Sequence, residues 1–395
     1  MEASDIPMVA ESARQYERGG TVLELSVVVP TYNEGRNPCL VADALKTVFE
    51  DRDFEVIFVD DSNDSESVSI LHELEATCDF VRVEHRTDAK GLGTAVVRGF
   101  ELAQGELIAV MDADMQHPPA VLLDMLVHMR QGYDIVVPSR FVPGGDDGGL
   151  SSFRKFVSWT ARILGQLALK RVRAVSDPTS GFFMMRCSVI QGVKLRPIGW
   201  KILMEVLVRG HYDRIVEIPY RFQSRVAGQS NMSIQEQWNY IKHLIKLVSE
   251  SPEDRRAYLF AGVGVSGVLI NMLIYTMMVH LHTELWIASV LSGSLAMVSN
   301  FVLNDRLTWH DSRNGALLKR FTKYAMTSLV GIGINAGVLA VLAYKLHVDY
   351  LAANASGIVV AMVWNFYVNS FWTWSTRRRQ VSVTVSAVAL ERSNA

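Results

Sequence analysis

The chain has 395 residues, which is long enough for two or three domains. Its formal net charge of −2 at pH 7 gives no electrostatic reason to expect a nucleic-acid partner. The three cysteines, Cys39, Cys78 and Cys187, lie far apart without a C-x-x-C pair, which argues against a zinc site and is typical of free thiols in a reducing compartment. Residues 1–22 lack the basic start and apolar core of a signal peptide, so we expect a flexible tail there.

Apolar strands and helical segments alternate after this tail. Strands are predicted at "LELSVVVPTYNE" (23–34), "FEVIFVDDSNDSE" (54–66), "VRVEHR" (81–86) and "ELIAVMDAD" (106–114). Alternation of this kind predicts an α/β domain with a parallel sheet, in which ligands bind beyond the carboxyl ends of the strands. Polar residues gather at these ends: Tyr32, Asn33, Glu34, Asp60, Asp61, Asp112 and Asp114. Several acidic strand ends indicate a shared cation or a ribose.

The glycines do not support a dinucleotide-binding fold. After the first strand the chain reads P-T-Y-N-E-G (30–35), not G-x-G-x-x-G. The G-x-G in "KGLGTAVVRG" (90–99) follows the third strand and lacks the remaining glycine spacing, so we interpret it as a tight turn that opens a helix.

The fourth strand ends in "DADMQHPP" (112–119), a D-x-D sequence followed by an amide. Two carboxylates one residue apart offer hard oxygen ligands, and Gln116 adds a neutral one. Mg²⁺ and Mn²⁺ prefer oxygen shells that are shared among protein, phosphate and water. We therefore predict that Asp112, Asp114 and Gln116 hold a divalent metal against a diphosphate. His117, which two prolines follow, is expected to form the turn before the next helix.

An amphipathic helix suited to the membrane interface is predicted at about residues 150–171. Arg154 and Ser158 are four residues apart and share one face of this helix, and Arg140 ends the preceding strand. Two arginines and a hydroxyl suit a lipid phosphate, and the alternative is that the arginines only extend to lipid head groups. A second amphipathic helix is expected over residues 231–256.

Four uncharged stretches fill the remainder of the chain. Each has about 20 residues or more, enough to cross roughly 30 Å of hydrocarbon as a helix. A soluble protein would have to bury four successive helices with almost no polar face. The stretches lie between Arg256 and Glu284, between Glu284 and Asp305, from Tyr324 to Tyr344, and from Tyr350 to Thr376. We expect a domain of four transmembrane helices over residues 257–376 and a tail over residues 377–395.

Basic residues flank these stretches unevenly. They are concentrated before the first, around the central connection and after the last, whereas the two opposite loops hold only Lys345. The positive-inside rule then predicts that both termini and the N-terminal domain lie in the cytoplasm.

The membrane stretches also repeat, with an offset of 64 to 65 residues. "SGVLIN" (266–271) resembles "VGIGIN" (330–335), and "NFVLNDRLTW" (300–309) resembles "NFYVNSFWTW" (365–374). Two helical hairpins from one duplicated unit explain this pattern. Asparagines recur at matched places, either as hydrogen-bonding groups between packed helices or as a polar path for a lipid head group: Asn271, Asn300, Asn304, Asn335, Asn365 and Asn369.

Six motifs in this order resemble family 2 glycosyltransferases of the GT-A fold, and more narrowly polyprenol (dolichol) phosphate mannose synthases: "VVVPTYNE", "VDDSND", "GLGTA", "MDADMQHPP", "PSRF" and "DPTSGFF". The membrane part resembles the GtrA-like four-helix domain. The resemblance implies a Rossmann-like GT-A domain over residues 23–230. It also implies transfer of mannose from GDP-mannose to a polyprenyl (dolichyl) phosphate, with Mg²⁺ or Mn²⁺ as cofactor.

The resemblance further implies roles for individual residues. The nucleotide sugar would be held by Pro30, Tyr32, Glu34, Val59, Asp61, Asp112, Ala113, Asp114, Gln116, Lys201 and Arg225. The lipid phosphate would be held by Arg140, Arg154 and Ser158, and Asp112, Asp114, Arg140 and Arg154 would act in catalysis. The family often reads G-x-S-K where this chain has Gly228, Ser230 and then Asn231, and the missing lysine would either weaken diphosphate binding or indicate a different donor.

The expected chemistry needs no general base, because a phosphate acceptor is already an anion near neutral pH. Catalysis would then depend on positioning two anions and on neutralising the leaving diphosphate, and a single in-line displacement would invert the anomeric centre. We expect Asp177 to order its loop and Glu205 to pair with a cation or a sugar hydroxyl.

Other functions compete with this one. A processive polysaccharide synthase should carry Q-x-x-R-W, and "QEQWNY" (235–240) lacks the arginine. A polyprenyl-phosphate glucosyl or aminosugar transferase that uses a UDP-sugar remains open, as does a lipid-linked sugar transporter with a regulatory glycosyltransferase-like domain. The sequence also leaves open the oligomeric state and whether the membrane domain anchors the protein or moves lipid.

Overall fold

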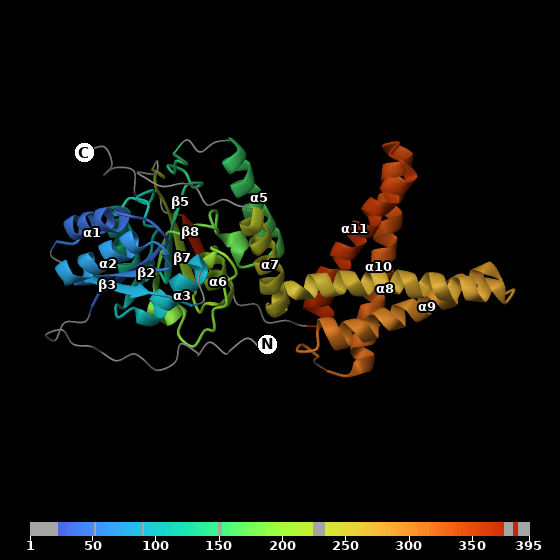
Figure 1. Ribbon diagram of the computed structural model, residues 1–395. Coiled ribbons are helices and arrows are strands. Elements are labelled where there is room, and N and C mark those ends of the chain that lie inside the picture. Colours follow the sequence, from blue (N-terminus) through green and yellow to red (C-terminus); the bar gives the residue numbers. More distant parts are fainter. Residues whose placement is uncertain are drawn as a thin grey trace. The chain divides into compact units, whose positions relative to one another are not determined.

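The structure is a computed structural model that describes residues 23–50, 53–88, 91–148, 152–223, 234–313, 315–374 and 382–385. The chain divides into two compact units (Figure 1). The first comprises Met1–Val248 together with Gln380–Ala395, and the second is Ser249–Arg379. The first unit is an α/β domain, as the sequence predicted, and the second is helical.

An eight-stranded sheet in the order β3-β2-β1-β4-β6-β5-β7-β8 forms the centre of the first unit. β6 runs antiparallel to both of its neighbours, and the other pairs are parallel. The strands are β1 (Leu25–Thr31), β2 (Phe54–Asp60), β3 (Val81–His85), β4 (Leu107–Val110), β5 (Ile135–Ser139), β6 (Phe183–Arg186), β7 (Arg214–Pro219) and β8 (Ser382–Val385).

Helices cover both faces of this sheet, and each face has its own hydrophobic core. The alternation of side chains along a strand is visible in β1, where Val28 packs into one cluster while Val27 and Val29 pack into the other. The helices are α1 (Asn37–Val48), α2 (Ser65–Thr77), α3 (Leu92–Leu102), α4 (Val121–Arg130), α5 (Ser152–Ala168), α6 (Ile202–Arg209) and α7 (Ile234–Glu250), with short turns η1 (Val172–Ala174) and η2 (Cys187–Val189). Strands buried on both sides explain the continuous apolar runs of the sequence.

The C-terminal segment contributes to the sheet. Residues 382–385 form β8, which pairs in parallel with β7, Ser382 opposite Arg214 and Val385 opposite Glu217. The sequence shows only a short alternating apolar stretch here, within the segment 377–395 that we expected to be a tail. Strand β8 has only four residues, and its partner β7 precedes the whole membrane unit in the chain. No local feature of the sequence therefore identifies this pairing.

The two amphipathic helices α5 and α7 pack against one another. The Tyr240 hydroxyl of α7 donates a hydrogen bond to the Ala161 carbonyl of α5 at 2.6 Å. Each helix also leaves a tryptophan and an aliphatic side chain exposed: Trp159 and Leu167 on α5, Trp238 and Ile245 on α7. An exposed apolar face that carries tryptophan suits a membrane interface.

The second unit is built from two helical hairpins. Helix α8 packs along α9, and α10 packs along α11. Within the described residues, three helical stretches are long and apolar enough to cross a membrane: Pro252–His280, Leu285–Thr308 and Leu317–Lys345. The elements are α8 (Pro252–His280), α9 (Leu285–Leu303), η3 (Asn304–Thr308), α10 (Leu317–Ala340), η4 (Val341–Lys345), α11 (Tyr350–Val368) and η5 (Asn369–Thr373).

The juxtamembrane helix α7 ends at Glu250, and a separate helix, α8, begins at Pro252. The Ser251 side chain accepts a hydrogen bond from the Asp254 backbone N–H, and Pro252 occupies the first turn, where its missing N–H costs nothing. Residues 251–256, which we assigned to the juxtamembrane helix, therefore belong to the cap and first turn of α8.

The repeat in the sequence is a repeat in the structure. Thr308 donates a hydrogen bond to Asn304 at 2.8 Å, and the matched Thr373 donates to Asn369 at 2.6 Å, each in a short π-helical turn. The tryptophans that end the two turns, Trp309 and Trp374, stack face to face with ring centroids 4.3 Å apart and an interplanar angle of 3°.

One ion pair distinguishes the two repeats. The Asp305 carboxylate accepts hydrogen bonds from Arg320 at 2.8 and 3.1 Å and from the Trp374 indole at 2.9 Å. Asp305 belongs to the first hairpin, and both of its partners belong to the second. This buried pair therefore ties the hairpins together beside the stacked tryptophans.

Matched glycines let the helices of each hairpin approach closely. A Cβ at Gly267 would collide with the Asn300 side chain, whereas a Cβ at Gly264, one turn earlier in α8, would meet nothing within 4 Å. We expect Gly267→Ala to lower the free energy of unfolding by about 1–3 kcal/mol through overpacking. Gly264→Ala gains only helix propensity, about 1 kcal/mol, and serves as the matched control. Thermal unfolding of both variants in detergent checks this, and equal midpoints would contradict the close packing.

Candidate active site

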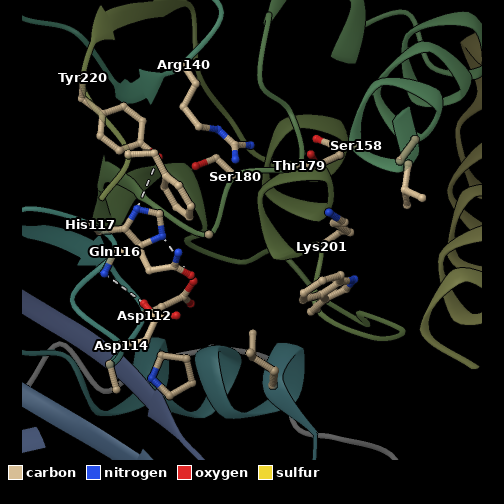
Figure 2. A pocket seen from close by; sticks show the side chains of 18 of the residues that line it. Asp112, Asp114, Gln116, His117, Arg140, Ser158, Thr179, Ser180, Lys201 and Tyr220 are labelled. Atoms are coloured by element: carbon tan, nitrogen blue, oxygen red, sulfur yellow. Dashed lines mark hydrogen bonds and ion pairs between the residues drawn. The ribbon is translucent and has the colours of Figure 1, made fainter. Parts of the chain in front are cut away.

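A pocket opens at the carboxyl ends of the parallel strands, where the sequence predicted the ligand site. Figure 2 shows Asp112 and Asp114 on one side of it and Arg140, Ser158 and Lys201 across from them. The predicted site residues that line this pocket are Pro30, Glu34, Asp112, Ala113, Asp114, Gln116, Arg140, Ser158 and Lys201.

Three predicted residues do not line the pocket. The Tyr32 ring is exposed, and Val59 is fully buried in β2, where it packs against Ile57 and Ala95. The buried Asp61 carboxylate accepts hydrogen bonds from Arg86 at 2.6 and 2.8 Å and from the Gly91 backbone N–H at 2.7 Å. Asp61 thus anchors the turn that opens α3.

Two further predictions fall where the structure gives no side-chain description. Arg154 lies in α5, but its side chain is outside the described part of the chain. Arg225 and the neighbouring Asn231 lie between residues 223 and 234, also outside the described residues.

The D-x-D carboxylates are held by their own turn. Asp114 accepts the Gln116 backbone N–H at 3.1 Å, and the Gln116 side-chain amide donates to the Gln223 carbonyl at 3.1 Å. Asp112 faces Gly181, where a Cβ would lie 3.2 Å from the Asp112 carboxylate, tighter than most real contacts. Glycine at residue 181 therefore leaves room for the acidic group and for whatever it binds.

His117 does more than form a turn. Its Nε2 lies 3.2 Å from the Asp112 carboxylate and its Nδ1 lies 3.4 Å from the Tyr220 hydroxyl. The ring is buried and packs against Phe182 and Phe222. The histidine thus orients the carboxylate of a predicted metal ligand, a contact that the local sequence did not predict.

The donor set at the D-x-D fits a divalent metal shared with a ligand. No cluster of three or more His, Cys, Asp or Glu side chains that could hold a metal occurs among the described residues. Mg²⁺ and Mn²⁺ need no all-protein cage, because one or two carboxylates together with phosphate oxygens and water complete their shells. Asp112 and Asp114, side by side at the rim of the pocket, match this arrangement.

Arg140 is fixed by a buried carboxylate. Its Nε and Nη2 donate to Asp177 at 2.9 and 2.8 Å, and Asp177 is fully buried. Burial disfavours the charge of Arg140, but Asp177 together with Tyr220 and Asp147 raises the pKa of Arg140 above its ordinary value. The loop role expected for Asp177 therefore includes holding a permanent cation at the pocket.

Lys201 is a cation of a different kind. It is the residue before α6, and its ammonium lies 4.6 Å from the centroid of the Trp200 ring. Burial lowers its pKa to about 8, although Asp177 and Asp112 favour the charged form. Lys201 is therefore charged at neutral pH but loses its charge within an accessible pH range.

Glu205 lies outside the pocket lining and pairs with a cation. Its fully buried carboxylate accepts hydrogen bonds from the Arg196 backbone N–H at 2.6 Å and from Arg209 at 2.7 Å, and the His243 ring lies 3.6 Å away. These contacts join α6 to the preceding loop and to α7.

The pocket also contains residues that sequence reasoning missed. Thr179, Ser180 and Gly181 line it because β6 begins at the edge of the sheet where β5 ends, and these residues form the loop that leads into β6. The motif "DPTSGFF" was a usable signal for these three. Tyr220 directly follows β7, so the strand-end rule would have found it if residues 214–219 had been recognised as a strand.

Comparisons with known proteins agree with this architecture. Residues 26–193 match the family "Glycosyl transferase family 2", and residues 259–374 match "GtrA/DPMS, transmembrane domain". These matches define the class, a family 2 glycosyltransferase domain joined to a membrane domain. A dolichol-phosphate mannosyltransferase of Pyrococcus furiosus is 36% identical over 90% of this chain and 100% of its own length. The chain belongs to the dolichol-phosphate mannosyltransferase family, as its motifs indicated.

Further relatives cover less of the chain. The dolichol-phosphate mannosyltransferase of Saccharomyces cerevisiae is 31% identical over 57% of this chain and 87% of its own length. Among solved structures, glucosyl-3-phosphoglycerate synthase of Mycobacterium tuberculosis in complex with phosphoglyceric acid is 18% identical, with a TM-score of 0.44 over 58% of this chain and 80% of that chain.

The pKa of Lys201 predicts a pH dependence. Because the charged form exists below about pH 8, kcat/KM for a nucleotide-sugar donor should fall by about tenfold per pH unit well above that value. Lys201→Arg keeps the charge and should remove this decline, whereas Lys46→Arg, on the exposed surface of α1, should leave it unchanged. Steady-state rates between pH 6.5 and about 10 check this, and a decline that persists in Lys201→Arg would contradict it.

Proposed function

We propose that the protein transfers mannose from GDP-mannose to the phosphate of a polyprenyl (dolichyl) phosphate and inverts the anomeric centre. The observation that carries this proposal is the composition of one pocket, in which the acidic strand end of Asp112 and Asp114 faces the cations Arg140 and Lys201. Membership of the dolichol-phosphate mannosyltransferase family supports a nucleotide-sugar donor and a polyprenyl phosphate acceptor.

The donor would bind on the acidic side of the pocket. Asp112 and Asp114, with Gln116, would hold Mg²⁺ or Mn²⁺, and such an ion neutralises the charge that develops on a leaving diphosphate. Lys201 adds a positive charge near the same carboxylates, and Glu34 and Pro30 line the end of β1 where the nucleoside would lie. The metal, Lys201 and Glu34 would each meet a charged or polar part of a nucleoside diphosphate sugar.

The acceptor phosphate would bind between Arg140 and Ser158. Ser158 is on α5, and the same helix exposes Trp159, Leu164 and Leu167, which suit contact with lipid. One helix thus contributes both to the pocket and to an apolar surface. A polyprenyl chain could lie along that surface while its phosphate reaches the pocket.

The reaction is then one displacement. A phosphate oxygen of the acceptor forms a bond to the anomeric carbon while the bond from that carbon to the nucleoside diphosphate breaks, so an α-linked donor gives a β-linked product. The acceptor is already an anion, and the protein supplies alignment and charge compensation rather than a base.

We also propose that all four helices of the second unit cross the membrane and that the catalytic domain and both termini are cytoplasmic. The chain enters this unit from α7, and the segment that leaves it continues into β8 of the sheet in the first unit. A sheet on one side of the membrane requires an even number of crossings between β7 and β8. That requirement supports α11, a helix of 19 residues, as the fourth span.

Sugar transfer tests the chemical proposal. Full-length protein in detergent is incubated with a short polyprenyl phosphate and radiolabelled GDP-mannose or UDP-glucose, in the presence of Mg²⁺, Mn²⁺ or a chelator. We expect metal-dependent transfer from GDP-mannose that falls more than about hundredfold in Asp114→Ala. Asp53→Ala removes an exposed carboxylate just before β2, at the amino end of that strand, and should retain full activity.

The other outcomes separate the competing functions. Transfer from UDP-glucose alone would replace the donor assignment and make Asn231 the first residue to examine. Absence of transfer from either donor, with the protein folded, would favour the lipid-transporter alternative. Transfer that persists in the chelator would contradict the metal assignment.

Cysteine labelling tests the topology. Single cysteines at His282 and His347, in the two loops between the helices of each hairpin, should react with an impermeant maleimide in intact cells. A cysteine at Arg313, in the connection between the hairpins, should react only after permeabilisation. Labelling of Arg313→Cys in intact cells, or protection of His347→Cys, would contradict four crossings with a cytoplasmic domain.

A further inference from the structure

A series of hydrogen bonds leads from the interior of the sheet to the pocket. It starts at Glu217 on β7, which is 2% exposed and is not part of the pocket lining. The Glu217 carboxylate accepts the Ser176 backbone N–H at 2.9 and 3.0 Å, the Ser176 hydroxyl at 2.7 Å and the Asp177 backbone N–H at 3.3 Å. One buried acceptor therefore fixes two consecutive residues of the loop before β6.

The second of these residues is the partner of Arg140. A single oxygen of the Asp177 carboxylate, Oδ2, lies 2.9 Å from Nε and 2.8 Å from Nη2 of Arg140, and these two contacts on one edge of the guanidinium set its direction. Ser139, directly before Arg140, has its hydroxyl 2.6 Å from the Ser176 hydroxyl. Residues 176 and 177 are thus tied to Glu217 on one side and to the Arg140 segment on the other.

The remaining contacts of Arg140 are less directional. Its guanidinium lies 5.3 Å from the centroid of the Phe141 ring and 5.1 Å from that of Phe222, and such contacts constrain orientation less than paired hydrogen bonds. Burial raises the pKa of Glu217, and the Ser176 donors act against this rise because they favour the carboxylate. The same hydrogen bonds therefore favour the carboxylate form of Glu217 and hold the loop in position.

We propose that Glu217 is a positioning residue for the acceptor phosphate, which acts through Ser176 and Asp177 to hold the Arg140 guanidinium where it meets the lipid phosphate. Glu217 touches no substrate, so its effect is transmitted entirely by these hydrogen bonds. The inference rests on the proposed role of Arg140 in the transferase.

Glu217→Gln tests the inference, because glutamine keeps the shape of the side chain but replaces one acceptor oxygen with a donor that opposes the Ser176 N–H. We expect KM for a short polyprenyl phosphate to rise by about tenfold, as for the loss of a charged hydrogen bond, and KM for GDP-mannose to change by less than about twofold. Ser176→Ala, a milder change, should shift the acceptor KM in the same direction by a smaller factor.

Glu55 provides a matched control. It is a buried carboxylate on β2 of the same sheet, and it accepts hydrogen bonds from Ser26 at 2.7 Å, from the Gln104 backbone N–H at 2.8 Å and from Arg82 at 3.0 Å. None of these partners lines the pocket. Glu55→Gln should lower the unfolding midpoint as Glu217→Gln does, yet leave the acceptor KM unchanged.

A double-mutant cycle with Arg140→Ala separates positioning from general damage. If Glu217 acts through Arg140, Glu217→Gln should raise the acceptor KM no further once Arg140 is alanine. An unchanged acceptor KM in Glu217→Gln, or effects that add fully in the double variant, would overturn the inference while leaving the transferase proposal intact. An unchanged acceptor KM in Arg140→Ala would instead overturn the proposed role of Arg140, and this inference with it.

Discussion

Parallel strands deliver their carboxyl ends to one edge of a sheet, and the site of this protein depends on that constraint. Pro30, Ala113, Arg140 and Tyr220 come from four separate segments of the chain, yet they meet because each ends or follows a parallel strand. The antiparallel β6 adds a loop at the same edge, since it starts where its neighbour ends. The sheet itself thus brings side chains that are distant in sequence into one pocket.

The charged side chains of this pocket differ in their partners and in their burial. The Arg140–Asp177 pair is buried, and burial also lowers the pKa of Lys201 to about 8. Asp112 keeps a more open position, supported from behind by His117. Fixed cations of this kind orient an anionic ligand and compensate the charge that develops on it.

We could predict the D-x-D site, the polar strand ends and the membrane repeat from the sequence, because each is a local pattern with a physical cause. The sequence did not predict that the Asp61 carboxylate pairs with Arg86, or that Val59 packs against α3. His117 contacts Asp112 only five residues before it, and its other partner, Tyr220, is distant. Glu217 acts through partners 40 and 41 residues away in the chain, so it had no local signal. The same is true of β8, whose short alternating stretch is compatible with disorder until β7 lies beside it.

The position of β8 has a consequence for the order in which the protein is made. Strand β7 leaves the ribosome early, but its outer edge stays unpaired until the whole membrane unit has been synthesised and β8 follows. An unpaired edge is a site for wrong association between chains. The sheet of the first unit is therefore completed only after the whole membrane unit has been synthesised.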